Sequence, residues 1–100
     1  MLKLADLIDE NLEWLAELET AAMGAPISAT KWIASTMSTW WRYYAGWTDK
    51  LGGESLEDLD GSYRMVRYEP LGVCAGIASW NATLFYLSWK IAPAVAAGNT

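Results

Sequence analysis

Histidine is absent from this 100-residue sequence, and cysteine occurs only once, as Cys74. The lack of histidine excludes Ser-His-Asp catalysis, Cys-His catalysis and HExxH zinc sites within the chain. A single cysteine excludes internal disulfides and cysteine-rich metal sites, and it agrees with a reducing compartment such as the cytoplasm.

Basic side chains are also scarce. Lys and Arg number seven against twelve Asp and Glu, which gives a net charge of −5. Residues 1–25 carry one Lys and six acidic residues, whereas residues 26–100 are neutral. Because phosphate recognition depends on clustered Lys and Arg, nucleic-acid binding is not expected.

Aromatic and aliphatic residues dominate the composition. The hydrophobic fraction is 53%, with seven Trp and five Tyr but one Phe. This excludes a disordered tail. It is a heavy aromatic load for a small core, so we expect some rings to pack against groups outside the chain.

An amphipathic helix is predicted over residues 2–22. The acidic residues Asp6, Glu10, Glu13 and Glu17 form a solvent-exposed stripe, and Gly24 followed by Pro26 ends the helix. The opposite stripe is apolar at spacings of three and four: Leu4, Ile8, Leu12, Leu15, Leu18 and Ala22.

A second helix is predicted from a Ser28 cap to about Asp49. Its continuous apolar stripe is typical of a core-facing surface and consists of Ile33, Met37, Trp40, Tyr44 and Trp47. A base- or sugar-stacking platform is the minority interpretation, because no cationic groove accompanies the rings.

Residues 52–70 have a different pattern. Gly52-Gly53 breaks the helical period, and residues 54–61 read as a polar loop. Residues 63–68 then alternate as a strand with mixed exposure on both sides, and Pro70 ends it. Such a strand suits a sheet edge or a projecting ribbon.

Residues 71–89 contain no charge, which satisfies the length rule for a membrane-spanning helix. Small and polar residues are frequent there, and Asn81 at the middle would be costly in lipid. We therefore favour a soluble arrangement without a membrane span. It has a short buried strand over 72–78, a turn at Trp80-Asn81 and an apolar helix over 83–97 with Pro93 near its end.

A strand, a turn and a helix followed by Gly98-Asn99 form half of a βαβ unit. The returning parallel strand is not within the sequence. One strand of a parallel sheet is not stable alone, so we expect the chain to be a piece of a larger domain.

Several segments resemble the NAD(P)-dependent aldehyde dehydrogenase superfamily, and the resemblance covers essentially all 100 residues. The most specific signal is Trp80-Asn81 followed by Trp89-Lys90 and a terminal Ala-Gly-Asn-Thr at 97–100. The other matching segments, in the family's order, are residues 4–8, 18–20, 24–27, 43–50, 69–73 and 91–94.

The resemblance implies an α/β fold: an incomplete piece of a Rossmann-like cofactor-binding domain with two N-terminal helices and part of a bridging β-ribbon. It implies that residues 1–51 are the helical part of the cofactor domain. Residues 52–70 would be the oligomerisation ribbon, and residues 71–100 the first strand and helix of the Rossmann-like sheet. A homodimer or homotetramer is expected for the full subunit.

The family is an oxidoreductase family that converts an aldehyde to a carboxylic acid with NAD or NADP through a cysteine thiohemiacetal. Asn81 matches the family's oxyanion-hole asparagine, and the alternative is that it only caps the following helix. The family's cofactor cleft is matched by Ala78, Ser79, Trp80 and Asn81, and its substrate tunnel by Ala82, Tyr86 and Trp89. Plain helix packing is the alternative for Tyr86 and Trp89.

Three departures from the family pattern matter. Ser79 stands where the family usually has proline, and Ala82-Thr83 stand where it has an aromatic residue and proline, which affects the substrate. An acidic residue near a monovalent-cation site is replaced around Ala22, so we predict no metal. Cys74 lies on the predicted buried strand and is interpreted as a core residue, not the nucleophile.

The nucleophile and the glutamate base of the family have no match in the sequence, so we expect the chain alone to be inactive. Two alternatives stay open from the sequence. One is a small non-enzymatic protein that uses residues 71–97 as a membrane anchor or interaction surface, and the other is the relic of a broken gene.

Overall fold

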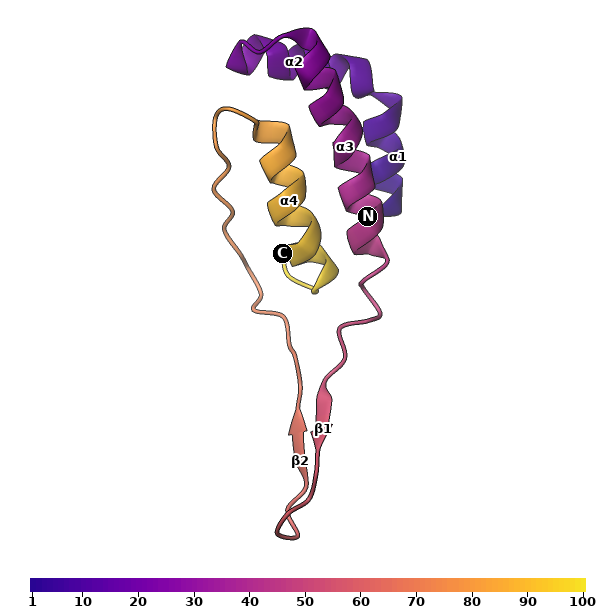
Figure 1. Cartoon of the computed structure of the whole chain (residues 1–100), viewed down its shortest axis with the longest axis vertical. Coiled ribbons are helices and arrows are strands. Elements are labelled where there is room, and N and C mark those ends of the chain that lie inside the picture. Colours follow the sequence, from indigo (N-terminus) through magenta and orange to yellow (C-terminus); the bar gives the residue numbers. More distant parts are fainter.

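The computed structural model describes residues 1–100 as a helical body and a projecting ribbon, with a longest dimension of 63 Å (Figure 1). The body contains α1 (Leu2–Glu10), α2 (Leu12–Met23), α3 (Ile27–Ala45) and α4 (Thr83–Ala96). The ribbon contains β1 (Glu54–Leu56) and β2 (Arg64–Val66). Helix α3 is central, because it packs against α1, α2 and α4.

The predicted single helix over 2–22 is wrong, because Asn11 divides it into α1 and α2. Asn11 Nδ2 donates to Leu7 O at 2.8 Å, so its side chain bonds to the last turn of α1. The predicted stop is confirmed: Gly24 ends α2 in the left-handed region at φ 76°, which glycine adopts without steric cost. The acidic stripe is solvent-exposed, as predicted.

Helix α3 differs from its prediction at both ends and along its buried face. It begins after Pro26 with no side-chain cap, so the Ser28 cap is wrong, and it ends at Ala45. The tryptophan in the core is Trp41, 7% exposed, whereas Trp40 is half-buried and Trp47 is exposed. The main core cluster joins α1, α3 and α4 and consists of Ala5, Ile8, Met37, Trp41 and Ala92.

An ion-pair cluster ties α1 to α3 at the surface. Arg42 lies 2.8 Å from Asp6 and 2.7 Å from Asp9. Hydrogen bonds from Ser38 and then Arg42 lower the pKa of Asp9 from its usual value of 3.8. The charged carboxylate of Asp9 is therefore stabilised in the folded chain.

The ribbon is antiparallel, with Glu54 opposite Val66 and Leu56 opposite Arg64. Its second strand confirms part of the predicted strand over 63–68, but β1 lies within residues 54–61, where only a loop was predicted. Every position of the two strands is exposed, as expected for a projecting element. The strand β1 was not predictable from the sequence, because a ribbon exposed on both faces has no apolar alternation and the three residues Glu54, Ser55 and Leu56 show none.

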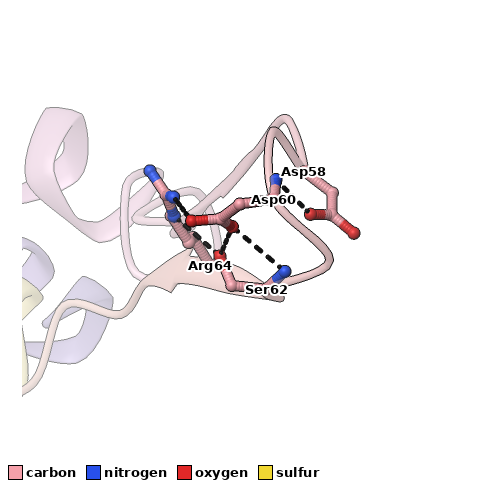
Figure 2. A network of polar contacts seen from close by, with 4 residues as sticks. All are labelled: Asp58, Asp60, Ser62 and Arg64. Carbon is pink, nitrogen blue, oxygen red and sulfur yellow. Dashed lines mark hydrogen bonds and ion pairs between the residues drawn. The ribbon is translucent and has the colours of Figure 1, made fainter.

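A polar network closes the tip of the ribbon (Figure 2). The Asp60 carboxylate accepts hydrogen bonds from the backbone N–H and hydroxyl of Ser62, and Arg64 lies 2.8 Å from it. The Ser62 bonds, more than Arg64, hold the pKa of Asp60 below its usual value. Asp58 in turn accepts a bond from the Asp60 N–H.

The predicted buried strand over 72–78 is not formed. Residues 71–77 are exposed, Val73 and Ile77 by 91% and 87%, and Cys74 is an exposed thiol and not a core residue. Two backbone hydrogen bonds show how this segment pairs with another. Thr100 N donates to Gly72 O, and Cys74 N donates to Thr100 O. This alternation is the bond pattern of a parallel bridge, so the absence of a strand follows from the lack of further pairing partners.

Helix α4 confirms the predicted helix over 83–97 to within one residue and contains Pro93 in its last turns. Small buried residues allow close packing on the α3 side, namely Ser88, Ala92 and Ala96. The extended segment before α4 returns from the ribbon and runs alongside this helix (Figure 1). None of the helices combines the length and apolar character needed to cross a membrane.

Candidate functional site

The predicted site residues lie on one continuous stretch, from the segment and turn that precede α4 to the middle of that helix. Trp80 and Asn81 form the turn that precedes the helix, and both are exposed. Asn81 Oδ1 accepts a hydrogen bond from Ser79 Oγ. Asn81 Nδ2 donates no hydrogen bond to any group in the chain, so both of its N–H donors are available to a ligand.

Asn81 does not cap α4, so the capping interpretation of this residue is wrong. The N-cap position is Ala82, and no side-chain cap is formed there. A backbone N–H of the first turn, that of Leu84, is instead bonded to Glu19 Oε1 of α2 at 3.4 Å. A carboxylate at this end of a helix also interacts favourably with the helix dipole.

Glu19 is a residue that the sequence reasoning did not assign to the site. Glu19 is only 3% exposed, unlike Glu13 and Glu17 of the same helix. Its place in the sequence could have indicated burial. Glu19 lies three residues after Ala16, and both are buried on the same face of α2. An acid on an apolar face needs a buried donor, and the end of α4 provides it.

The backbone from Ala78 to Asn81 is free to contact a ligand. No backbone–backbone hydrogen bond involves these residues, and the only side-chain bond to their carbonyl groups comes from Thr83 Oγ1 to Ser79 O at 3.5 Å. Apart from Ala78, which is half-buried, these residues are exposed. Such a segment offers unpaired N–H and C=O groups of the kind that bind polar cofactors.

Aromatic rings lie beside the turn along α4. Trp89 is 43% exposed, and Ala82 and Tyr86 are half-buried. The Trp89 ring contacts Phe85 at a centroid distance of 4.1 Å and Trp40 of α3 at 5.5 Å. Trp89 therefore packs between helices and still presents part of its ring, and Phe85 joins this group although sequence reasoning did not single it out.

The comparisons with known proteins show the family of the chain. The family model described as "Aldehyde dehydrogenase family" matches residues 1–100. The chain belongs to the aldehyde dehydrogenase family. The predicted resemblance is thereby confirmed over the whole sequence.

Two curated relatives and one solved structure illustrate the match. The chain is 45% identical to betaine aldehyde dehydrogenase of Bacillus subtilis over 102 residues, which cover 100% of the chain and 21% of that protein. It is 42% identical to an aldehyde dehydrogenase of Emericella nidulans over 98 residues, 98% of the chain and 20% of the relative. The NAD+ complex of the Bacillus cereus aldehyde dehydrogenase superposes with a TM-score of 0.92 at 41% identity, covering 99% of the chain and 20% of that structure.

The chain thus spans about a fifth of the length of the relatives that it matches. Its helices and ribbon correspond to a piece of the aldehyde dehydrogenase fold, which confirms the predicted fold class. The uncompleted pairing at Gly72, Cys74 and Thr100 agrees with this coverage.

Proposed function

We propose that the chain contributes the oxyanion donor to an NAD(P)-dependent oxidation of an aldehyde to a carboxylic acid. In this reaction a cysteine thiolate outside residues 1–100 forms a C–S bond to the aldehyde carbon, and the carbonyl electron pair moves onto oxygen. Hydride leaves that carbon with its electron pair, giving a thioester. Water, deprotonated by a glutamate, then cleaves the thioester to the acid and restores the thiolate.

Asn81 acts on the oxygen that gains negative charge in the first step. Its Nδ2 is a neutral donor without a partner in the chain, and the turn before α4 fixes where it lies. A prepositioned donor of this kind stabilises the transition state by about 3 kcal/mol, because it needs no reorganisation when the charge appears. An amide also keeps its protons at every physiological pH.

The nicotinamide cofactor, NAD or NADP, supplies the hydride acceptor. The unpaired backbone groups of residues 78–81 fit a polar cofactor that is bound through main-chain contacts. We assign Ala82, Tyr86 and Trp89 to the wall of the aldehyde pocket, where the exposed part of the Trp89 ring offers an apolar surface. The small side chain of Ala82 leaves room for a bulkier substrate than an aromatic residue there would allow.

The ribbon supports an assembly role. We also infer that residues 1–51 and 71–100 belong to the cofactor domain and that the enzyme is cytoplasmic. For residues 52–70 we infer that they join subunits into a homodimer or homotetramer. The support is the projection of the ribbon from the helices, with Leu59, Tyr63 and Met65 exposed by 60–77% (Figure 1). A strand pair exposed on both faces is marginally stable until a partner covers it.

The observation that carries the proposal is that Asn81 Nδ2, in the turn before α4, donates no hydrogen bond within the chain. A hybrid subunit tests it, in which residues 1–100 replace the matching residues of Bacillus subtilis betaine aldehyde dehydrogenase. We expect the hybrid subunit to reduce the nicotinamide cofactor when an aldehyde is added, and the 100-residue chain alone not to do so. A folded hybrid without activity would contradict the proposal.

A further inference from the structure

The side chains of Ser79 and Asn81 are hydrogen-bonded to each other at the turn before α4. The hydroxyl of Ser79 donates to Oδ1 of Asn81, two residues later. No other hydrogen bond reaches the Asn81 side chain. The orientation of this amide therefore depends on one hydroxyl group.

That orientation matters because the two ends of an amide are chemically opposite. Oδ1 only accepts hydrogen bonds and Nδ2 only donates them, while rotation about χ2 exchanges their positions at low cost. A donor held on Oδ1 directs Nδ2 to the other side of the amide group. Without it, the amide is free to turn Oδ1 toward the developing negative charge, where it would repel the oxyanion.

The backbone that carries the pair is itself attached to the helical body. Thr83 Oγ1 donates to Ser79 O at 3.5 Å, which links the start of the turn to the first residue of α4. Glu19 Oε1 accepts from Leu84 N, which links the same end of α4 to α2. These two bonds attach the turn that carries Ser79 and Asn81 to α4, and α4 to α2.

We infer that Ser79 is a positioning residue that selects the donor face of the Asn81 amide, an inference that rests on the proposed function of Asn81. Ser79 does not touch the reacting atoms. Its effect is to keep Nδ2 on the side of the amide away from the Ser79 hydroxyl before the aldehyde arrives, so that the amide is not reoriented during the reaction. Removing the hydroxyl lowers the fraction of chains in which Asn81 presents a donor.

The hydroxyl is isolated by comparing Ser79→Thr with Ser79→Val. Thr and Val have the same branched shape, so the two variants differ mainly in the donor group. In the hybrid subunit, we expect kcat of S79V to be roughly 10-fold to 100-fold below that of S79T, because small misplacements of catalytic groups have effects of this size. KM for the aldehyde should differ little, because Ser79 acts through Asn81 on the transition state.

Nuclear magnetic resonance of the 100-residue chain tests the geometry without catalysis. The chain has no Gln and three Asn residues, so its spectrum contains only three side-chain amide pairs. Asn11 Nδ2 donates to Leu7 O and Asn99 Nδ2 to Ala94 O, and these two pairs are internal controls. Relative to S79T, S79V should shift and mobilise the Asn81 pair while the controls stay fixed.

Identical Asn81 signals in S79T and S79V would overturn the inference, whatever Asn81 does in catalysis. Equal kcat values for S79T and S79V, in a hybrid subunit that loses activity on Asn81→Ala, would also overturn it and leave the proposed function intact. If Asn81→Ala leaves kcat unchanged, the proposed function fails instead, and the amide signals still decide whether Ser79 orients Asn81.

Discussion

The carboxylate of Glu19, on α2, accepts a hydrogen bond from the backbone N–H of Leu84 at the start of α4, at 3.4 Å. The two residues are 65 positions apart in the sequence. This contact joins the N-terminal helices to the turn that carries Asn81. A residue remote from the predicted site in sequence therefore helps to attach that site to the helical body.

Replacing Glu19 by Ala should destabilise the chain. The substitution leaves the Leu84 N–H without its partner and removes a buried side chain, which costs about 1–3 kcal/mol of unfolding free energy. Glu17→Ala is the matched control, because Glu17 is on the same helix and exposed, and its effect should stay within about 0.5 kcal/mol. Urea unfolding measures both, and equal losses would contradict the role of Glu19.

Trp41 and Trp14 allow a second comparison with one residue type. Trp41 is 7% exposed in the core cluster between α1, α3 and α4, whereas Trp14 is 61% exposed. Trp41→Ala should lower the unfolding free energy by about 3–5 kcal/mol, because it leaves a cavity. Trp14→Ala should change it far less, and a similar loss in both variants would show that the core lies elsewhere.

The stability of the chain should depend on the protonation of Asp9. Its pKa is lowered in the folded state by Ser38 and then Arg42, so the unfolded chain binds this proton more readily. The stabilisation is complete above the ordinary pKa of 3.8 and is lost as pH falls through the lower folded value. Asp9→Asn should therefore be less stable than the unsubstituted chain near neutral pH. The difference in their unfolding free energies should become smaller as the pH is lowered. A difference in unfolding free energy that does not change with pH would contradict this role of Asp9.

Adjacent glycines in the ribbon should respond differently to alanine. A Cβ at Gly53 would lie 2.0 Å from Val66 O on the opposite strand, whereas a Cβ at Gly52 would meet nothing within 4 Å. Gly53→Ala should separate β1 from β2, because a contact with backbone is not relieved by side-chain rotation. In the hybrid subunit, amide hydrogen exchange over 54–56 and 64–66 should accelerate in G53A and not in G52A. Protection retained in G53A would rule out this close approach.

The helices were largely predictable from the sequence because their apolar faces repeat at helical spacing. The break at Asn11 was not, since the apolar period continues across it and only the bond from Asn11 Nδ2 to Leu7 O marks the end of α1. The choice of Trp41 over Trp40 was also hidden, because neighbouring aromatic residues give the same pattern and tertiary packing decides which is buried.

The extended segments were harder to predict for a different reason. Residues 72–78 have the composition of a buried strand, but a strand forms only beside a partner, and Thr100 alone supplies such bonds. The position of Asn81 in a turn before a helix was predicted correctly. The Glu19 contact and the Ser79 bond to Asn81 could not be read from spacing, because they depend on how α2 and the turn meet α4.

Asn81 is proposed to donate a hydrogen bond from Nδ2 to the developing oxyanion. The most direct test is the steady-state kinetics of the hybrid subunit with Asn81→Ala and Asn81→Asp. Asp has nearly the shape of Asn but replaces the donor by a second oxygen. We predict that kcat falls by about 10²–10³ in both variants while KM for the aldehyde changes little. An unchanged kcat in the Asp variant would contradict the claim, because that variant has no donor at Nδ2.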